Sequence, residues 1–178
     1  KKNKPTIVST GLSNQQEIDK AVRAFESTGN KKLIILHCVA IYPPEDSQVN
    51  LNRILTLKNL YPYTIGFSDH SIGAAMPITS IALGARVIEK HFTIDKKMDG
   101  WDHHISADEN DMKQIVNGCK RAFDGLGSEK IVRIESQRSM LDVKRPGTGL
   151  SPEKIKDILG KKALRDISED ELLKDEDF

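Results

Sequence analysis

Residues 64–106, TIGFSDHSIGAAMPITSIALGARVIEKHFTIDKKMDGWDHHIS, contain four of the five histidines and decide the fold of the chain. The residue pattern predicts a strand over Thr64 to Phe67, a helix rich in small residues over Ala74 to Leu83, and a strand over Arg86 to Ile88. This order and length are typical of a parallel βαβ unit. The sequence therefore predicts two neighbouring parallel strands joined by a helix.

A polar tripeptide follows each of these strands: Ser68-Asp69-His70 after the first and Glu89-Lys90-His91 after the second. Neighbouring parallel strands are about 4.8 Å apart, so His70 and His91 are expected to converge at the carboxyl edge of the sheet. Imidazole is a common ligand of divalent transition metals, but a histidine in such a position equally often has a structural role. The spacing alone leaves both interpretations open.

The composition, with 38% hydrophobic and 30% charged residues, is that of an ordinary globular protein. A formal net charge of +1 provides no field that would hold a polyanion, so no nucleic-acid partner is expected. No membrane or targeting segment is expected either. Cys38 and Cys119 lie in different predicted elements without CxxC spacing, which favours reduced, non-catalytic thiols in a cytoplasmic protein.

Further strand and helix patterns surround this stretch. They predict a strand over Thr6 to Ser9, a helix capped by Asn14, a buried strand over Leu33 to Cys38, a helix marked by Leu51 to Leu60, and a helix over Ala107 to Phe123. Four consecutive βα units leave two candidate folds, an open doubly wound sheet or part of a (β/α)8 barrel. A complete barrel needs about 250 residues, so the chain would hold roughly half of one.

The sequence pattern changes near residue 125. Residues 126–140 are charged and weakly patterned, as in a linker, and residues 141–178 contain VKRPGTGLSP, a short amphipathic segment and an acidic end. The predicted organisation is a barrel portion over residues 1–125, a linker over 126–140 and a small module over 141–178.

Several segments resemble the sialic acid synthase (N-acetylneuraminate synthase) family in both order and spacing. They are KPTIVSTG (4–11), LHCVAIYP (36–43), IGFSDHS (65–71), ALGARVIEKHFT (82–93) and DHHIS (102–106), with KRPGTGLSP (144–152) and LGKKALRDI (159–167) similar to the antifreeze-like (SAF) domain of that family. The resemblance implies a (β/α)8 TIM barrel, of which the chain begins at the fifth strand, followed by part of the SAF domain. It also implies a transferase that condenses phosphoenolpyruvate with N-acetylmannosamine or a related amino sugar.

The same resemblance implies a divalent metal bound by His70 and His91. Manganese is the first candidate, with magnesium and cobalt as alternatives. Glu89, His70 and His91 match catalytic residues of the family. In this role Glu89 either stabilises a cationic carbon or activates the attacking water. His37 matches no metal ligand and is expected to be structural.

Five residues match substrate-binding positions of the family. Ser9 and Ser68 match hydroxyls that hold the phosphate of phosphoenolpyruvate, and Tyr42 matches a residue that offers its backbone amide. Asp102 matches a residue that binds sugar hydroxyls. Arg145 matches an arginine that the SAF domain of one subunit delivers into the active site of the other, which implies a homodimer.

Two positions depart from the family pattern. Ala40 stands where some members carry an asparagine near the phosphate, and Trp101 replaces a proline that many members carry. The acceptor sugar therefore stays open, and His103 and His104 are expected to be solvent-facing loop residues. Alternative functions are a legionaminate, pseudaminate or spore-coat polysaccharide synthase, a metal-dependent aldolase, or a non-catalytic interaction module. These 178 residues alone are expected to be inactive.

Overall fold

The structure, a computed structural model, describes residues 3–132, 150–168 and 171–178. The chain divides into two compact units, Lys1–Gly127 and Ser128–Phe178. Among the residues described, no helix has the length and apolar character needed to cross a membrane.

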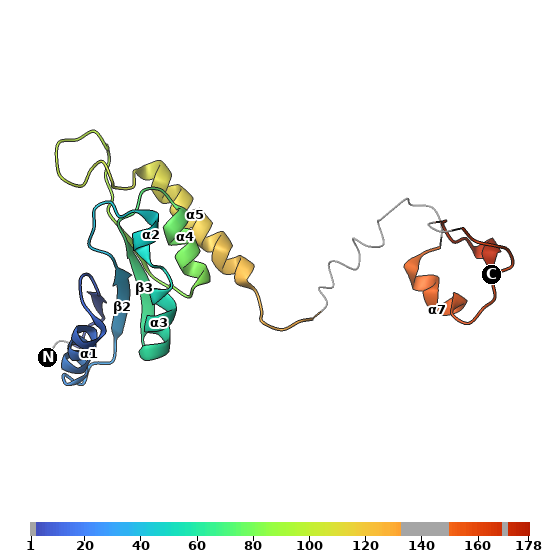
Figure 1. The fold of residues 1–178 in the computed structure, drawn as a ribbon, viewed down its shortest axis with the longest axis horizontal. Helices are drawn as coiled ribbons and strands as arrows, with labels where there is room; N and C mark the ends of the chain where they lie inside the picture. The colour runs from blue at the N-terminus through green and yellow to red at the C-terminus, as the bar shows by residue number, and fades with distance from the viewer. Residues whose placement is uncertain (1–2, 133–149, 169–170) are drawn as a thin grey trace. The chain divides into compact units, whose positions relative to one another are not determined.

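The first unit alternates strands and helices along the chain (Figure 1). Its elements are β1 (Thr6–Ser9), α1 (Gln15–Glu26), β2 (Leu33–Cys38), α2 (Asp46–Val49), α3 (Arg53–Leu60), β3 (Thr64–Asp69), α4 (Ala75–Ala82), β4 (Ile88–Lys90) and α5 (Glu109–Leu126). The strands form one parallel sheet in the order β1-β2-β3-β4. A doubly wound sheet reverses its strand order at a switch point. The sequential order therefore favours the other candidate, half of a (β/α)8 barrel.

One face of the sheet is covered by helices, and the hydrophobic core lies there. Alternate residues of β2 and β3 point to this outer face and contact side chains of α1 and α3. The contacting residues are Val22, Leu33, Ile35, Ile54, Leu57, Ile65 and Phe67, all of them buried. The residues between them along each strand point to the opposite, inner side of the half barrel.

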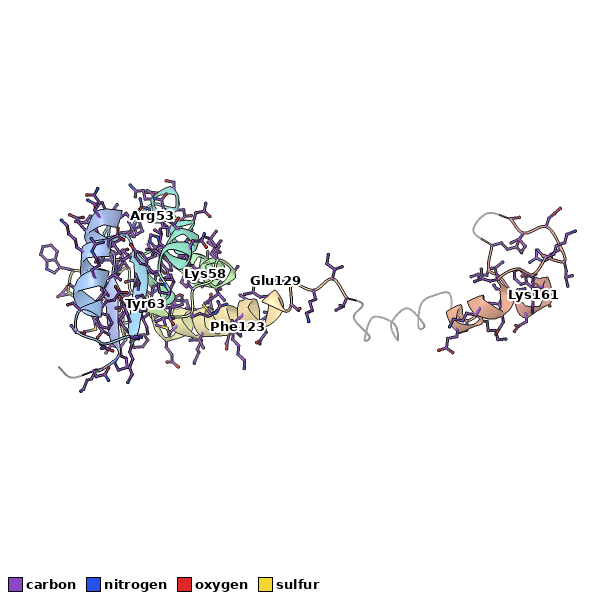
Figure 2. The ribbon with its side chains drawn as sticks, turned by 90° about the horizontal axis from the view of Figure 1, so that it is seen from below. Arg53, Lys58, Tyr63, Phe123, Glu129 and Lys161 are labelled. Atoms are coloured by element: carbon purple, nitrogen blue, oxygen red, sulfur yellow. The ribbon has the colours of Figure 1, made fainter. Side chains whose placement is uncertain are left out.

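Helix α5 closes the series by packing on α4. Gly118 of α5 permits this approach, because an added Cβ would lie 2.2 Å from Cδ1 of Ile78. Phe123, labelled in Figure 2, lies further along α5. The guanidinium carbon of Arg86 lies over its ring, 5.1 Å from the ring centroid. This cation–π contact ties the end of α5 to the residues that precede β4.

The elements of the structure differ from the predicted ones chiefly at the ends of β3 and β4. Strand β3 continues to Asp69, and β4 begins at Ile88 rather than ending there, although the N–H of Arg86 already donates to the carbonyl of Ile65 at 2.8 Å. The polar residues before each histidine therefore lie inside the strands. The four-residue helix α2 was not predicted, and its capping box joins Glu45 to Gln48.

The second unit contains η1 (Pro152–Lys154), α7 (Ile155–Ile158) and η2 (Asp175–Asp177). Its buried carboxylate, that of Asp177, accepts from the backbone N–H of Lys174 and from Nε of Arg165, both at 2.7 Å. Arg165 also pairs with Glu171 at 2.6 Å. The hydrogen bond from the backbone N–H of Lys174 lowers the pKa of Asp177 most, and the hydrogen bond from Arg165 lowers it further. An ion network thus contributes to holding a unit that is too short to bury a large core.

Candidate functional site

The sheet register stacks inner-face residues of neighbouring strands in layers. Ser68 of β3 pairs with Cys38 of β2 and with Glu89 of β4, so these three residues share one layer. The hydroxyl of Ser68 donates to Oε1 of Glu89 at 2.7 Å. His70 and His91 lie two residues beyond Ser68 and Glu89, each just after the end of its strand, and the same alternation directs both inward in the next layer.

The two imidazoles converge as the sequence predicted. Their ring centroids are 5.2 Å apart and their planes make an angle of 40°. Nδ1 of His70 lies 2.8 Å from the carbonyl oxygen of Val39. A carbonyl oxygen only accepts, so Nδ1 carries the proton, and the neutral form of the ring has its free lone pair on Nε2.

This arrangement fits a divalent metal. A metal–imidazole bond is about 2.1 Å long, so two rings at this separation can share one ion through their free nitrogens. The carbonyl of Val39 is the kind of outer partner that fixes the tautomer of a ligating histidine. Within the described ranges, no three His, Cys, Asp or Glu residues form a fuller ligand shell. Two imidazoles leave the remaining positions to water and substrate.

The backbone of His91 is held on the side away from β3. Its carbonyl accepts from the N–H of Ala107 at 2.8 Å, and the N–H of Thr93 donates to the carbonyl of Ala107 at 2.9 Å. Phe92 and Ala107 form a parallel bridge. The loop between them projects beyond the strands (Figure 1) but is closed at its base.

The ring of Tyr42 lies against both imidazoles, with centroid distances of 4.2 Å to His70 and 5.9 Å to His91. The side chain is 48% exposed, so the ring forms part of the mouth of the site. Burial raises the pKa of Tyr42, and Cys38, Asp102 and Glu89 add to the rise. Asp102, in the loop after β4, therefore lies within electrostatic reach of the same ring.

Two protein-family models match this chain. The NeuB family model matches residues 1–131, and the SAF domain model matches residues 137–178. The chain belongs to the NeuB family. This confirms the resemblance seen in the sequence and the assignment of the sheet to a TIM barrel.

Pseudaminic acid synthase of Campylobacter jejuni is 36% identical over 100% of this chain and 59% of its own length. N,N'-diacetyllegionaminic acid synthase of the same species is 31% identical over 98% of this chain and 60% of its own length. The crystal structure of N-acetylneuraminic acid (sialic acid) synthetase from Leptospira borgpetersenii has a TM-score of 0.72 at 35% identity, over 79% of this chain and 49% of that chain. The chain thus spans about three-fifths of the length of these curated relatives.

Ser9, which matches a phosphate-binding position of the family, lies apart from the two imidazoles. Ser9 pairs with Leu36 at the end of β1, two strands away from Ser68 and one layer lower, and its side chain is exposed. Arg145 lies outside the residues that the structure describes. The structure thus gathers His70 and His91 with Ser68, Glu89 and Tyr42, and it leaves Ser9 at the edge strand.

Cys38 faces the site, which the sequence did not reveal. Burial raises the pKa of its thiol, hydrogen bonds with Ser68 and the backbone of Gly11 oppose the rise, and Glu89 adds to it. The backbone N–H of Cys38 donates to Oγ1 of Thr10 at 3.0 Å. A raised pKa disfavours the thiolate, which is the nucleophilic form, so these surroundings do not activate Cys38 as a nucleophile.

Two other histidines have structural partners. His37 points to the outer face, where its Nε2–H donates to the carbonyl of Val49 at 2.7 Å, and burial lowers its pKa. His103 differs from the expected solvent-facing residue, because it is half-buried and its Nδ1 lies 2.8 Å from Oγ1 of Thr93. His104 is exposed. The contact of His103 holds the loop that carries Asp102.

Proposed function

We propose that the complete protein is a nonulosonic acid synthase. It condenses phosphoenolpyruvate with N-acetylmannosamine or a related amino sugar and water, giving a nonulosonic acid such as N-acetylneuraminate plus phosphate. Relatives named for pseudaminic, legionaminic and sialic acid synthesis support this reaction class. The observation that carries the proposal is the pair of imidazoles, 5.2 Å apart, directly above the Ser68–Glu89 hydrogen bond.

In this proposal His70 and His91 hold a divalent metal, with manganese as the first candidate. When bound, the metal supplies Lewis-acid polarisation of the aldehyde of the open-chain sugar. Glu89 lies one layer below the imidazoles. From there its carboxylate either stabilises the positive charge that develops on the phosphoenolpyruvate carbon or takes a proton from the attacking water.

The hydrogen bond of Ser68 limits what this residue can do at one time. Its hydroxyl has a single proton, which it donates to Glu89 at 2.7 Å. That proton cannot also be donated to a phosphate oxygen. If Ser68 binds the phosphate of phosphoenolpyruvate, it releases Glu89 from this hydrogen bond, so substrate binding would free the carboxylate for its catalytic role.

The direct test is phosphate release by the full-length protein. Phosphoenolpyruvate is supplied with N-acetylmannosamine or with the amino-sugar precursors of pseudaminic and N,N'-diacetyllegionaminic acids. We expect phosphate only when both substrates are present, and we expect a chelator to stop its release until Mn²⁺ is restored. A metal-dependent aldolase would release no phosphate in this way, and a non-catalytic interaction module would release none with any sugar.

Asp102 is proposed to bind the sugar, because its loop follows the strand that precedes His91. Asp102→Asn should raise the KM for the sugar, or lower kcat, by about 10-fold or more, since a hydrogen bond to a charged group contributes about 1.5–3 kcal/mol. Steady-state kinetics with each substrate varied in turn would measure this. Asp99→Asn, another exposed aspartate in the same loop, is the control. A loss that falls mainly on phosphoenolpyruvate would contradict the assignment.

The complete protein is further proposed to be a homodimer in which Arg145 of one subunit completes the site of the other. A guanidinium offers fixed, forked donors suited to the N-acetyl oxygen of the sugar. Mixing Arg145→Ala with His91→Ala protein should restore activity, because each heterodimer contains one site with an intact barrel and an intact arginine. A mixture that exchanges subunits yet stays inactive would show that Arg145 does not act across the interface.

A further inference from the structure

A buried ion pair lies between the two strands that carry the metal-binding histidines. Asp69 of β3 and Lys90 of β4 are register partners, and each directly precedes one histidine. Nζ of Lys90 lies 2.7 Å from Oδ2 of Asp69, and the two side chains are 3% and 0% exposed. Charged side chains are rarely buried so completely, because their desolvation is costly. The pair therefore suggests a role beyond stability, in positioning the residues next to it.

Ser71 completes the network on the other side of His70. Oδ1 of Asp69 accepts from the backbone N–H of Ser71 at 2.8 Å and from its hydroxyl at 2.7 Å. Lys90 also donates to the carbonyl oxygen of Ser71. The backbone on both sides of His70 is thus tied to the residue that precedes His91.

The ion pair does not itself face the site. Side chains alternate along a strand, so Asp69 and Lys90 point outward, while Ser68, His70 and their partners on β4 point inward. Any effect on a metal must therefore pass through the backbone. The carbonyl of Val39, the residue after β2, holds the ring of His70, and the ion pair joins the ends of the two strands that precede the histidines.

We propose that Asp69, Lys90 and Ser71 form a clamp that positions His70 and His91 to bind one metal ion together. The inference rests on the metal site of the proposed function and adds to it three positioning residues that touch neither metal nor substrate. Outer partners that orient metal ligands typically change metal affinity 10–100-fold when removed. A loss of about this size is expected here when the link between the strands is cut.

Stability alone does not explain the network. An apolar pair of similar volume is often as stable as a buried ion pair, whereas removal of one partner strongly destabilises the fold. The double substitution Asp69→Asn/Lys90→Met removes both charges together, so that neither is left buried without a partner. Asparagine keeps an oxygen for the N–H and hydroxyl of Ser71, methionine fills the space of the lysine stem, and the charged link between β3 and β4 is lost.

The test measures Mn²⁺ affinity of the whole chain by titration, with circular dichroism and thermal melting on the same samples. We expect the double variant to melt cooperatively near the wild-type temperature and to bind Mn²⁺ about 10–100-fold more weakly. Lys113→Met is the matched control. It removes the 2.7 Å pair with Glu109, which lies on the exposed face of α5, and it should leave Mn²⁺ affinity unchanged.

Two further variants keep both buried charges, so they remain informative if the double variant does not fold. Ser71→Ala removes the hydroxyl that donates to Asp69 and should weaken Mn²⁺ binding, whereas Lys90→Arg keeps a cation beside Asp69 and should retain most of the affinity. Wild-type affinity in a folded Ser71→Ala or double variant would overturn the positioning role while leaving the proposed function intact. A wild-type chain that binds no Mn²⁺ would overturn the metal site and this inference together.

Discussion

His70→Ala and His91→Ala are each expected to abolish tight Mn²⁺ binding without unfolding the protein. The two imidazoles, 5.2 Å apart, are the proposed ligands, and within the described residues no group of three His, Cys, Asp or Glu could hold a metal ion. Losing one leaves a single nitrogen ligand, and the loss of affinity should exceed the roughly 100-fold that the removal of an outer partner produces. Metal analysis after gel filtration, together with titration of the metal-free protein, would measure the effect.

The control for both variants is His104→Ala, because His104 lies in the exposed loop after β4. This variant should keep the manganese content of the wild type. Circular dichroism should show the same helix and strand content in all three proteins, since neither His70 nor His91 belongs to the hydrophobic core cluster. Undiminished manganese in either alanine variant would show that the pair is not a shared metal site.

Gly66→Ala is expected to destabilise the first unit strongly. An added Cβ would lie 2.5 Å from Cδ2 of Leu36, 2.5 Å from the carbonyl oxygen of Val87 and 2.9 Å from its Cβ. The leucine methyl can move, but the carbonyl of Val87 accepts from the N–H of Phe67 at 2.8 Å and belongs to the sheet. Overpacking of this kind costs about 1–3 kcal/mol, and more where backbone must shift. The melting temperature should fall by roughly 10 °C.

Gly125→Ala provides the contrast. Gly125 lies near the end of α5, its φ is negative, and nothing lies within 4 Å of an added Cβ. Alanine should therefore stabilise the helix by about 0.5–1 kcal/mol. If Gly66→Ala melted at the same temperature as the wild type, the close approach of β4 to β3 would be wrong, and with it the layer that places Ser68 beside Glu89.

The strands were predicted well wherever hydrophobic pattern decides their position. The run Leu33 to Cys38 is β2 residue for residue, because a continuous apolar segment between Lys32 and the turn at Pro43 has few alternatives. The ends of β3 and β4 were misplaced, since they are fixed by hydrogen bonds and by the Asp69–Lys90 pair rather than by apolar side chains. Helix α2 was missed because the prolines before it are typical of a turn.

The convergence of His70 and His91 was predictable, but much of their surroundings was not. The same sequence offset separates Ser68 from Glu89, Asp69 from Lys90 and His70 from His91. Opposite charges at equivalent positions of the two tripeptides were therefore an available signal for the ion pair. No comparable signal exists for the ring of Tyr42, because a loop that follows a strand carries no periodicity.

The loop after β4 is closed at its base, so the shape of the rim of the site can change without a change in the spacing of the two imidazoles. His91 and Thr93 are fixed to Ala107 by main-chain bonds, which depend little on side-chain identity. Within the loop, His103 contacts Thr93, and Lys96 pairs with Asp111 of α5. We therefore expect insertions or substitutions among residues 94–104, which are largely exposed, to reshape the rim of the site while the imidazole pair keeps its spacing.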